Sequence, residues 1–586
     1  MRISRIFAAL ATAACLRAAP SFAQVSPASG EVTGRLDHLL LETIRGETRL
    51  QVYVAADDGT RTELTLDAAT ERQVSRLLGR RVRVGGTREG AKLRVRSLLA
   101  LDGPRRDDAP AVNSRRFITL LCQFPDIATV PNPPETYARW MGTGRASMRD
   151  FWREVSNGRA EVVGDGVYGW RTLPRHSDLY LYPLAARAMV EDCVAAHDAE
   201  VDFSQVDGLN IQVNKVDYDK PSGAGFLTLT LEGQSRTVAS TFLIGWATQG
   251  VYAHEIGHTF GLLHSFGATG VAYESPWDVM AIAGAMNAET REVESQHTLA
   301  FNKDRLGWMD ASRKVVPEAG TRRTITLSRS ALAGSSGALL VEIPVDSEFV
   351  SYTVEARRRA GYDRNLPADA VILNRKLLAD NGVPYARLVS RSTNSVQGAM
   401  WKVGDTYADS LLGVSVSVLA ETADGFIVEV RRGYELKTSV AGQGTVRAGD
   451  GEACAASCAA LYGARGTRVA IVATPAPGWR FAGWSGACSG FVACEVEMRR
   501  DRRVEARFAE GTQPDVQVTV DAAAAHLLGR AQLTAEQVGW LDQQGNANGR
   551  YDVGDFRAWL RSARPPVSAE MRPLVERLAP GAVPKR

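Results

Sequence analysis

One short segment near the middle of the chain constrains the molecule more than any other. Residues 254–264 carry the pattern His-Glu-x-x-His-x-x-Gly-x-x-His. On a helix, side chains four residues apart project from the same face, so His254 and His258 can converge on one metal ion. Gly261 can end that helix in a left-handed turn and bring His264 to the same ion. The spacing predicts a catalytic zinc site, because such sites use three protein ligands and keep a fourth position for water.

The same segment also fits a plain structural interpretation, an amphipathic helix packed against a core. Tyr252, Ile256 and Phe260 recur every four residues, so we expect them to face the interior. That pattern does not account for the opposite face, because the whole chain of 586 residues contains only eight histidines. Histidines at this spacing favour zinc, and Glu255 beside them is the candidate general base.

Met280, sixteen residues after His264, adds a second feature to the histidine motif. The helix together with this methionine resembles the metzincin zinc peptidases, whose Met-turn places a thioether beneath the three histidines. Within that clan, Trp-Asp-Val-Met at 277–280 and the segment 303–308 resemble the bacterial immune-inhibitor-A type, while the His-Ser pair at 264–265 also resembles gametolysins and matrixins. Ile282 stands where astacins and serralysins carry a zinc-binding tyrosine, so no tyrosine is assigned as transition-state stabiliser.

The chemistry that follows is peptide-bond hydrolysis without a covalent enzyme intermediate. Zinc bound by neutral histidines lowers the pKa of its water and polarises a carbonyl. Glu255 takes a proton from the attacking water and passes it to the leaving amine. The resemblance also implies that an edge strand above the zinc binds an extended peptide by adding it to the sheet. We therefore expect a zinc endopeptidase that acts on extracellular proteins.

Two other classes of protein compete with this interpretation. One is a surface or matrix-binding protein with a degenerate peptidase domain, against which the retained Glu255 argues. The other is a scaffold-docked binding module in which the C-terminal unit matters most. Nucleic acid is not an expected partner, because 69 basic and 66 acidic side chains leave a net charge of only +3.

The N-terminus predicts secretion. Arg2 and Arg5 precede an apolar run, and small residues before Gln24 offer a cleavage site, so residues 1–23 are typical of a signal peptide. Acylation of Cys15, as in a lipoprotein, is the competing interpretation. No later segment predicts a transmembrane span.

The remaining chain is too long for one core, so we expect a multidomain protein. Alternating apolar and polar residues, as at 81–86, predict strands in the N-terminal region, either an OB-like barrel or a generic β-sandwich. The expected order is a small OB-like β-barrel with a linker (24–110), an α/β metzincin catalytic domain (111–312), a β-sandwich (313–433), a cysteine-stapled β-repeat (434–510) and a small helical dockerin-like unit (513–570).

Six cysteines remain after the signal peptide, an even number that suits an oxidising compartment. Cys122 in an expected strand and Cys193 in a helix-like stretch form either a disulfide or two buried thiols. The other four lie in a segment small enough to need covalent staples, so we expect two disulfides with three possible pairings. These four are Cys454, Cys458, Cys488 and Cys494.

The same C-terminal segment carries a repeated aromatic pattern. Gly-Trp-x-Phe-x-Gly-Trp-x-Gly at 478–486 resembles the internalin-like β-repeats of bacterial surface and secreted proteins. Trp479 and Trp484 can stack on sugars, but in so small a module tryptophans more often form the core.

The last motif, residues 544–555, spaces oxygen donors as a calcium loop does, with Gly549 at the sharp turn. It resembles a dockerin loop, although the first position lacks the usual aspartate and only one such loop is visible. A plain Asn-Gly turn is the competing account. We also expect a docking or cell-surface partner for the C-terminal modules. The candidate ligands are Gln544, Asn546, Asn548, Arg550, Asp552 and Asp555.

Overall fold

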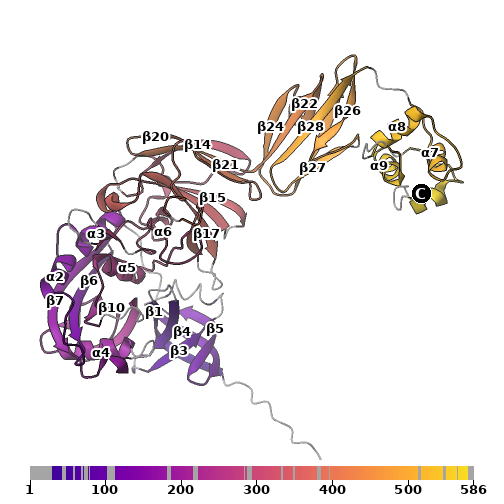
Figure 1. Cartoon of the computed structure of the whole chain (residues 1–586). Coiled ribbons are helices and arrows are strands. Elements are labelled where there is room, and N and C mark those ends of the chain that lie inside the picture. Colours follow the sequence, from indigo (N-terminus) through magenta and orange to yellow (C-terminus); the bar gives the residue numbers. More distant parts are fainter. Residues whose placement is uncertain are drawn as a thin grey trace, which may run out of the picture.

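The structure is a computed structural model, rich in β-sheet, with several sheets and a few small helices (Figure 1). The predicted signal peptide (1–23) and the predicted linker from residue 102 to 110 lie outside the described residues. Within the described part, no helix has both the length and the apolar character needed to cross a membrane. The described residues are 29–42, 48–56, 58, 60–66, 70, 77, 80–101, 113–180, 186–215, 222–282, 284–286, 293–331, 334, 336–347, 350–378, 384–394, 396–491, 493–511, 516–545, 550–563 and 565–578.

The first five strands form a closed barrel in the order β1-β2-β3-β5-β4-β1. Alternation in the sequence explains the closure, because apolar residues such as Leu36, Val84 and Leu93 fill the interior while Arg83 faces solvent. The strands are β1 (Ser29–Glu42), β2 (Thr48–Ala55), β3 (Arg61–Thr65), β4 (Arg81–Glu89) and β5 (Lys92–Ala100).

A second group of strands continues this sheet. In the order β9-β10-β8-β6-β7, β6, β7, β8 and β10 run parallel and β9 runs antiparallel. Pairing of β1 with β9 joins both groups into one sheet of ten strands. The strands are β6 (Asn113–Gln123), β7 (Ala160–Thr172), β8 (Gly208–Val213), β9 (Gly223–Leu231) and β10 (Gln234–Leu243).

Helices cover both faces of this second group. Leu121 on β6 joins the core beneath α2, α3 and α5, whereas Leu120 joins the core that includes α4. Adjacent strand residues point to opposite faces, and both faces of β6 are buried, each in a different core. The helices are α2 (Pro134–Met141), α3 (Met148–Val155), α4 (Ala186–His197), α5 (Gln249–Thr259) and, after the hairpin of β11 (Ala285–Met286) and β12 (Val293–Glu294), α6 (Ala300–Arg305).

The next region consists of two sheets packed face to face around a shared apolar core. Trp277 and Leu299 from the preceding region pack with Ile372 and Leu388 from this one, so the two regions share a further core. One sheet contains β13 (Lys314–Val315), β15 (Leu340–Ser347), β16 (Val350–Arg357), β17 (Ala370–Leu378) and β18 (Pro384–Leu388). The other contains β14 (Thr321–Ser328), β19 (Thr406–Asp409), β20 (Val414–Glu421) and β21 (Gly425–Arg432).

A separate two-sheet module follows. Disulfides join Cys454 to Cys458 and Cys488 to Cys494, which confirms two disulfides here and selects one of the three pairings. Trp484 is buried in the core, as predicted. The strands are β22 (Tyr434–Ala441), β23 (Gly444–Ala448), β24 (Ser457–Tyr462), β25 (Thr467–Pro475), β26 (Trp479–Gly486), β27 (Cys494–Met498) and β28 (Arg502–Glu510).

Short helices around their own core end the described chain and lie beyond this module in Figure 1. Phe556, Trp559 and Leu560 point from one face of α9 into that core, which explains the helical spacing of these apolar residues. The helices are α7 (Val520–Leu527), α8 (Ala535–Gln543), α9 (Val553–Ala563) and α10 (Arg572–Leu578).

Candidate metal centre

Helix α5 begins and ends as its sequence requires. Thr248 is the N-cap, and its side chain accepts a hydrogen bond from the Val251 amide. At the other end Gly261 has a φ of 86°, a backbone conformation that favours glycine. The amides of Gly261 and Leu262 donate to the carbonyls of His258 and Gly257, which is the Schellman pattern. The predicted left-handed turn is confirmed, and it carries the chain back toward His264.

The three histidines of the motif lie together in the interior. One ring nitrogen from each of His254, His258 and His264 forms a group whose atoms all lie within 4.8 Å of one another. The ring of His264 is tilted against that of His254, with centroids 5.3 Å apart. Glu255 is 3% exposed, so the candidate base is buried beside them. Tyr252 and Ile256 are fully buried on the core side, as predicted.

Hydrogen bonds fix which nitrogen of the first two histidines can bind a metal. His254 Nδ1 lies 2.7 Å from the Val279 carbonyl oxygen, and His258 Nδ1 lies 2.8 Å from the Leu262 carbonyl oxygen. A carbonyl only accepts, so each Nδ1 carries the proton and each neutral ring presents a lone pair at Nε2. The two Nε2 atoms are 3.2 Å apart. Two lone pairs at this distance repel each other unless a cation lies between them.

The separation of these nitrogens fits zinc. Two nitrogens bound tetrahedrally at ordinary zinc distances lie about 3.4 Å apart. The carbonyl acceptors at Nδ1 are the outer partners that orient ligating histidines in metal sites. The donor set of three neutral imidazoles is also one that zinc prefers. His254, His258 and His264 therefore fit this ion in chemistry and in spacing.

Met280 packs directly beneath the helix. A Cβ at position 257 would lie 2.7 Å from Met280 Sδ, so only glycine allows this approach between the two histidines. The turn that carries the methionine is held by Asp278, whose carboxylate accepts from the Met280 amide at 3.0 Å. Burial raises the pKa of Asp278. The methionine thus lies against the helix that carries His254 and His258, and its role in a Met-turn stays a prediction.

A buried ion pair from the following region supports this turn. Arg357 on β16 is fully buried, pairs with Asp363 and donates from Nη1 to the Trp277 carbonyl at 2.5 Å. The Asp363 carboxylate also accepts from the His297 amide at 3.0 Å, and the His297 carbonyl accepts from the Val279 amide at 3.3 Å. Val279 is the acceptor of His254, so these contacts connect the β-sandwich to the first ligand. No local motif in the sequence indicated this role for Arg357.

Lys303 lies in the same buried network. Its Nζ donates to His297 Nδ1 at 2.9 Å and to the Ser330 carbonyl at 2.5 Å. Burial lowers the pKa of Lys303 to about 8. His297 Nε2 donates to Glu154 at 2.8 Å, so α3 joins the network too. The Lys-Asp-Arg-Leu-Gly-Trp segment noted in the sequence therefore contributes a buried cation behind the Met-turn.

Tyr273 is a further residue near the histidines that the sequence reasoning missed. Its ring centroid lies 5.3 Å from that of His264 and 6.0 Å from that of His254. Its φ is 63°, which is strained for a bulky side chain and is found mostly where a site requires it. Ile282, two residues after Met280, was the position considered for a zinc-binding tyrosine, whereas Tyr273 comes before Met280. A Tyr so close to His264 in sequence was the available signal.

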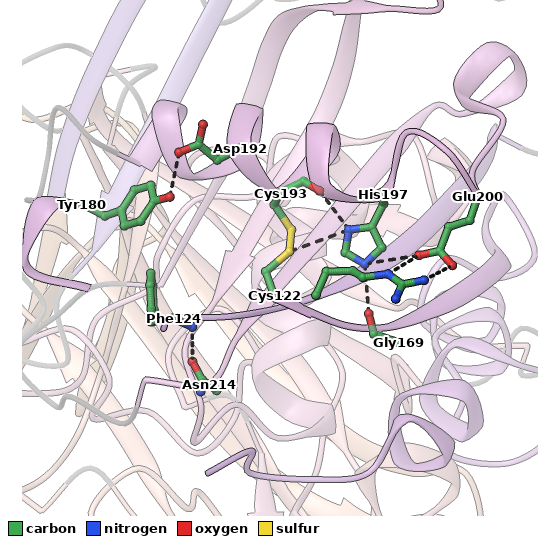
Figure 2. Close-up of a disulfide and its surroundings, with 10 residues drawn as sticks. Cys122, Phe124, Gly169, Tyr180, Asp192, Cys193, His197, Glu200 and Asn214 are labelled. Atoms are coloured by element: carbon green, nitrogen blue, oxygen red, sulfur yellow. Dashed lines mark hydrogen bonds and ion pairs between the residues drawn. A yellow bond between two sulfur atoms is a disulfide. The ribbon is translucent and has the colours of Figure 1, made fainter. Parts of the chain in front are cut away.

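A second group of potential metal ligands in the described part of the chain consists of Cys122, Cys193 and His197. Cys122 and Cys193 form a disulfide between β6 and α4, which decides between the two predicted alternatives (Figure 2). His197 lies against it, with Nδ1 4.0 Å from Cys122 Sγ and 2.9 Å from the Cys193 carbonyl (Figure 2). Both sulfurs are used covalently, so this group is structural.

The candidate calcium loop is only partly within the described residues. Asn546, Asn548 and the sharp turn predicted at Gly549 lie outside them. Asp552 Oδ1 accepts from the Gly554 amide at 2.6 Å, and the Asp552 amide donates to Asp555 Oδ2 at 2.8 Å. This reciprocal pattern caps α9, which begins at Val553. Gln544 ends α8 as its C-cap, and Arg550 lies in the segment before α9.

Comparison with known families identifies one module. A family model for the divergent InlB B-repeat domain matches residues 434–512, the segment of β22 to β28. This confirms the internalin-like β-repeat predicted there. A search of curated proteins finds none that matches the chain.

Proposed function

We propose that this chain is a secreted zinc-dependent endopeptidase of the metzincin clan. The observation that carries the proposal is the convergence of the ring nitrogens, with His254 Nε2 and His258 Nε2 3.2 Å apart and His264 beside them. A buried cluster of neutral imidazoles with this orientation is destabilising without a cation. A purely structural helix would have no reason to arrange them so.

The surrounding architecture supports the same proposal. A mixed sheet with helices on both faces leads from β10 directly into the histidine helix α5, and β9 is its antiparallel strand. Met280 packs against Gly257 under the histidines. A mixed sheet with one antiparallel strand before the histidine helix, and a methionine packed against that helix, supports the proposed metzincin resemblance.

Glu255 performs the proton transfers in this proposal. A zinc ion held by the three histidines would polarise a peptide carbonyl and lower the pKa of a water molecule. Glu255, buried beside the ligands, accepts a proton from the attacking water and donates it to the leaving amine. The burial of the site excludes competing solvent. Substrates are proteins or peptides in an extended conformation.

The other modules suit an extracellular enzyme. The three disulfides of the described chain agree with an oxidising compartment, which the predicted signal peptide at 1–23 also requires. We propose that the β-repeat and the dockerin-like helical unit provide contact with a cell surface or scaffold. Calcium binding at residues 544–555 belongs to the same proposal.

The test combines metal content with hydrolysis. Purified full-length protein should contain one zinc ion per chain and digest casein. Glu255→Ala should keep the zinc but lose activity by a factor of about 10³, because the proton acceptor is gone. Glu135→Ala, an exposed change on α2, is the matched control and should behave as wild type.

Two results would contradict the proposal. Casein digestion by Glu255→Ala at the wild-type rate would show that another group is the base. Zinc binding without hydrolysis in the wild type, under any condition that opens the site, would favour the surface-binding protein with a degenerate peptidase domain.

A further inference from the structure

The edge of β9 near the histidine helix is covered by another part of the chain. Gly223, at the start of β9, pairs with Phe242 near the end of β10, and α5 follows shortly after β10. The first half of β9 is therefore the half beside the candidate metal centre. β10 occupies one side of β9, and the other side is paired with β1 from His38 to Leu41.

β1 reaches β9 because it is longer than the barrel needs. Residues from Ser29 to Arg35 pair with β4, and residues from Arg35 to Glu42 pair with β2. The edge of β1 that pairs with β4 up to Arg35 pairs with β9 from His38 to Leu41. His38, Leu39, Leu40 and Leu41 lie opposite Phe226, Gly225, Ala224 and Gly223, in antiparallel register. Two strand edges, each a ready template for another strand, thus cover each other.

Side chains hold this contact at one end. The buried Asp37 carboxylate accepts from the Thr228 amide at 2.9 Å and from its hydroxyl at 2.6 Å. Arg61 on β3 donates to the Thr228 carbonyl and lies 3.6 Å from Glu191 on α4. The barrel is therefore attached to β9 by a short ladder and a few polar contacts, while its own core is closed around Leu36.

We propose that β1 occupies the binding site for the substrate backbone, so that the N-terminal barrel (29–101) is a built-in competitor of the substrate. The inference rests on the proposed function, in which an extended peptide adds to β9. The peptide would pair antiparallel with residues 223–226, the same residues that β1 now pairs with. An extended peptide can bind there only when β1 has left. The short ladder and the separate barrel core allow β1 to leave without unfolding either part.

A reversible lock tests this directly in the full-length chain. Leu40→Cys with Ala224→Cys places cysteines on directly opposed residues of β1 and β9. Opposed residues of an antiparallel pair have a Cα separation suited to a disulfide. Oxidised protein, with the bond verified by non-reducing peptide mapping, should hydrolyse fluorescein-labelled unfolded casein at least tenfold more slowly than the same protein after mild reduction. Wild type treated with the same reductant controls for the native disulfides.

A second pair controls for the presence of an added disulfide in the barrel. Arg83→Cys with Leu99→Cys joins opposed, exposed residues of β4 and β5, away from β9. Its oxidised form should hydrolyse casein as wild type does. An equal loss of activity in this control and in the β1–β9 lock would overturn the inference.

A release variant tests the opposite direction and does not depend on added cysteines. Arg61→Glu places a carboxylate against Glu191 and removes one of the two arginine donors to the Thr228 carbonyl, the other being Arg187. It should lower KM for casein about threefold or more and leave kcat unchanged, because only access changes. Lys92→Glu is the matched control, because Lys92 pairs with Glu63 inside the barrel. An unchanged KM in Arg61→Glu would contradict the inference.

Binding separates this inference from the proposed catalysis. In a Glu255→Ala background, fluorescence anisotropy of the labelled casein should show binding to the reduced lock and at least tenfold weaker binding to the oxidised lock. This difference in binding supports the inference even if the wild type and the lock variant with Glu255 intact do not hydrolyse casein. In that case only the proposed catalysis fails. Equal binding by both forms, or binding by neither, overturns the inference whether or not hydrolysis occurs.

Discussion

Two stretches of this chain carry the spacing of metal ligands, and the fold uses them differently. In residues 254–264, the Nδ1 atoms of His254 and His258 donate to carbonyls, and their Nε2 atoms face each other. In residues 544–555, the carboxylates of Asp552 and Asp555 accept from amides at the start of α9. The first arrangement is suited to a metal cation, whereas the second already has an explanation within the helix.

The difference teaches what ligand spacing alone can establish. Imidazole Nε2 atoms turned toward each other can share a cation, so the geometry is compatible with the proposed zinc site. Carboxylates at helix starts are stabilised by amides and by the helix dipole. The spacing of Asp552 and Asp555 is therefore explained by helix capping as well as by calcium binding. Calcium at residues 544–555 stays a prediction, and the variants below test each side of this comparison.

The largest effect should come from His264. His264→Ala leaves two ligands, so zinc affinity should fall at least about a hundredfold and casein hydrolysis should be lost. Zinc content after dialysis, measured by mass spectrometry, checks this. His176→Ala, an exposed histidine, is the matched control. Full zinc occupancy in His264→Ala would show that His264 is not a ligand, so the spacing of residues 254–264 would no longer indicate a metal site.

The next largest effect tests whether the zinc centre depends on the β-sandwich. Arg357→Met leaves Asp363 and Glu355 buried without their guanidinium partner, which should destabilise the protein by about 3–5 kcal/mol. Zinc affinity should also fall, because the Trp277 carbonyl loses its donor. Arg359→Met is the control, since this exposed neighbour lies 3.9 Å from Asp369 and its loss should cost at most about 1 kcal/mol. Denaturant titration and zinc competition measure both. Equal effects of the two variants would contradict the proposed support of the Met-turn.

Asp37 is a buried carboxylate that accepts from one amide and one hydroxyl, both of Thr228. Burial raises the pKa of Asp37 to about 6, despite its two hydrogen bonds from Thr228. A carboxyl whose pKa is raised by folding contributes most stability below its unfolded pKa near 4, and that contribution falls as pH rises through 6. Asp37→Asn should therefore raise stability at pH 7.5 by up to about 3 kcal/mol, at 1.4 kcal/mol per pKa unit. At pH 4 it should change little. Thermal melts at both pH values test this, and a gain at pH 4 as large as that at pH 7.5 would refute the assigned cause.

A smaller effect should mark Tyr273 as part of the zinc side of the comparison. Tyr273→Phe removes a hydroxyl near the histidines and should lower kcat for casein about tenfold, with KM and zinc content unchanged. Tyr385→Phe is the control, because its ring packs on Phe266. An unchanged kcat in Tyr273→Phe would leave the strained tyrosine with a structural role only.

The smallest effect on hydrolysis should come from the C-terminal loop. Asp555→Ala removes an acceptor for the Asp552 amide, so α9 should lose about 1 kcal/mol of local stability while casein hydrolysis is unchanged. Calorimetry of the full chain with millimolar calcium then decides the cause. A heat of calcium binding that is present in the wild type and absent in Asp555→Ala supports a calcium loop. No heat of binding in the wild type supports a helix cap alone. Glu570→Ala, an exposed change, serves as the control.

Much of this molecule follows from local sequence. The strand at β6, the helix α3 after Ser147, and the histidine helix with its glycine end were all predictable, because each depends on residues within a few positions. The internalin-like repeat was recognisable from its spaced tryptophans and glycines. Local capping and alternation specify such elements before any packing occurs.

Pairing between distant segments was not predictable in the same way. Four cysteines permit three pairings, and only the folded module brings Cys454 to Cys458 and Cys488 to Cys494. The same holds for Cys122 and Cys193, which lie 71 residues apart. A choice between disulfide and thiols requires the distance between Cα atoms, which only tertiary structure supplies.

The sequence by itself determined the candidate ligands, the base and the residue beneath them, because helical spacing and one glycine bring these side chains together locally. The tertiary structure decided what surrounds them. Arg357 reaches the Met-turn from a sheet that begins after the motif ends, and β1 reaches β9 from a barrel that precedes it. Such contacts depend on how whole sheets pack and on which strand edges remain to be paired, and no short stretch of sequence records either.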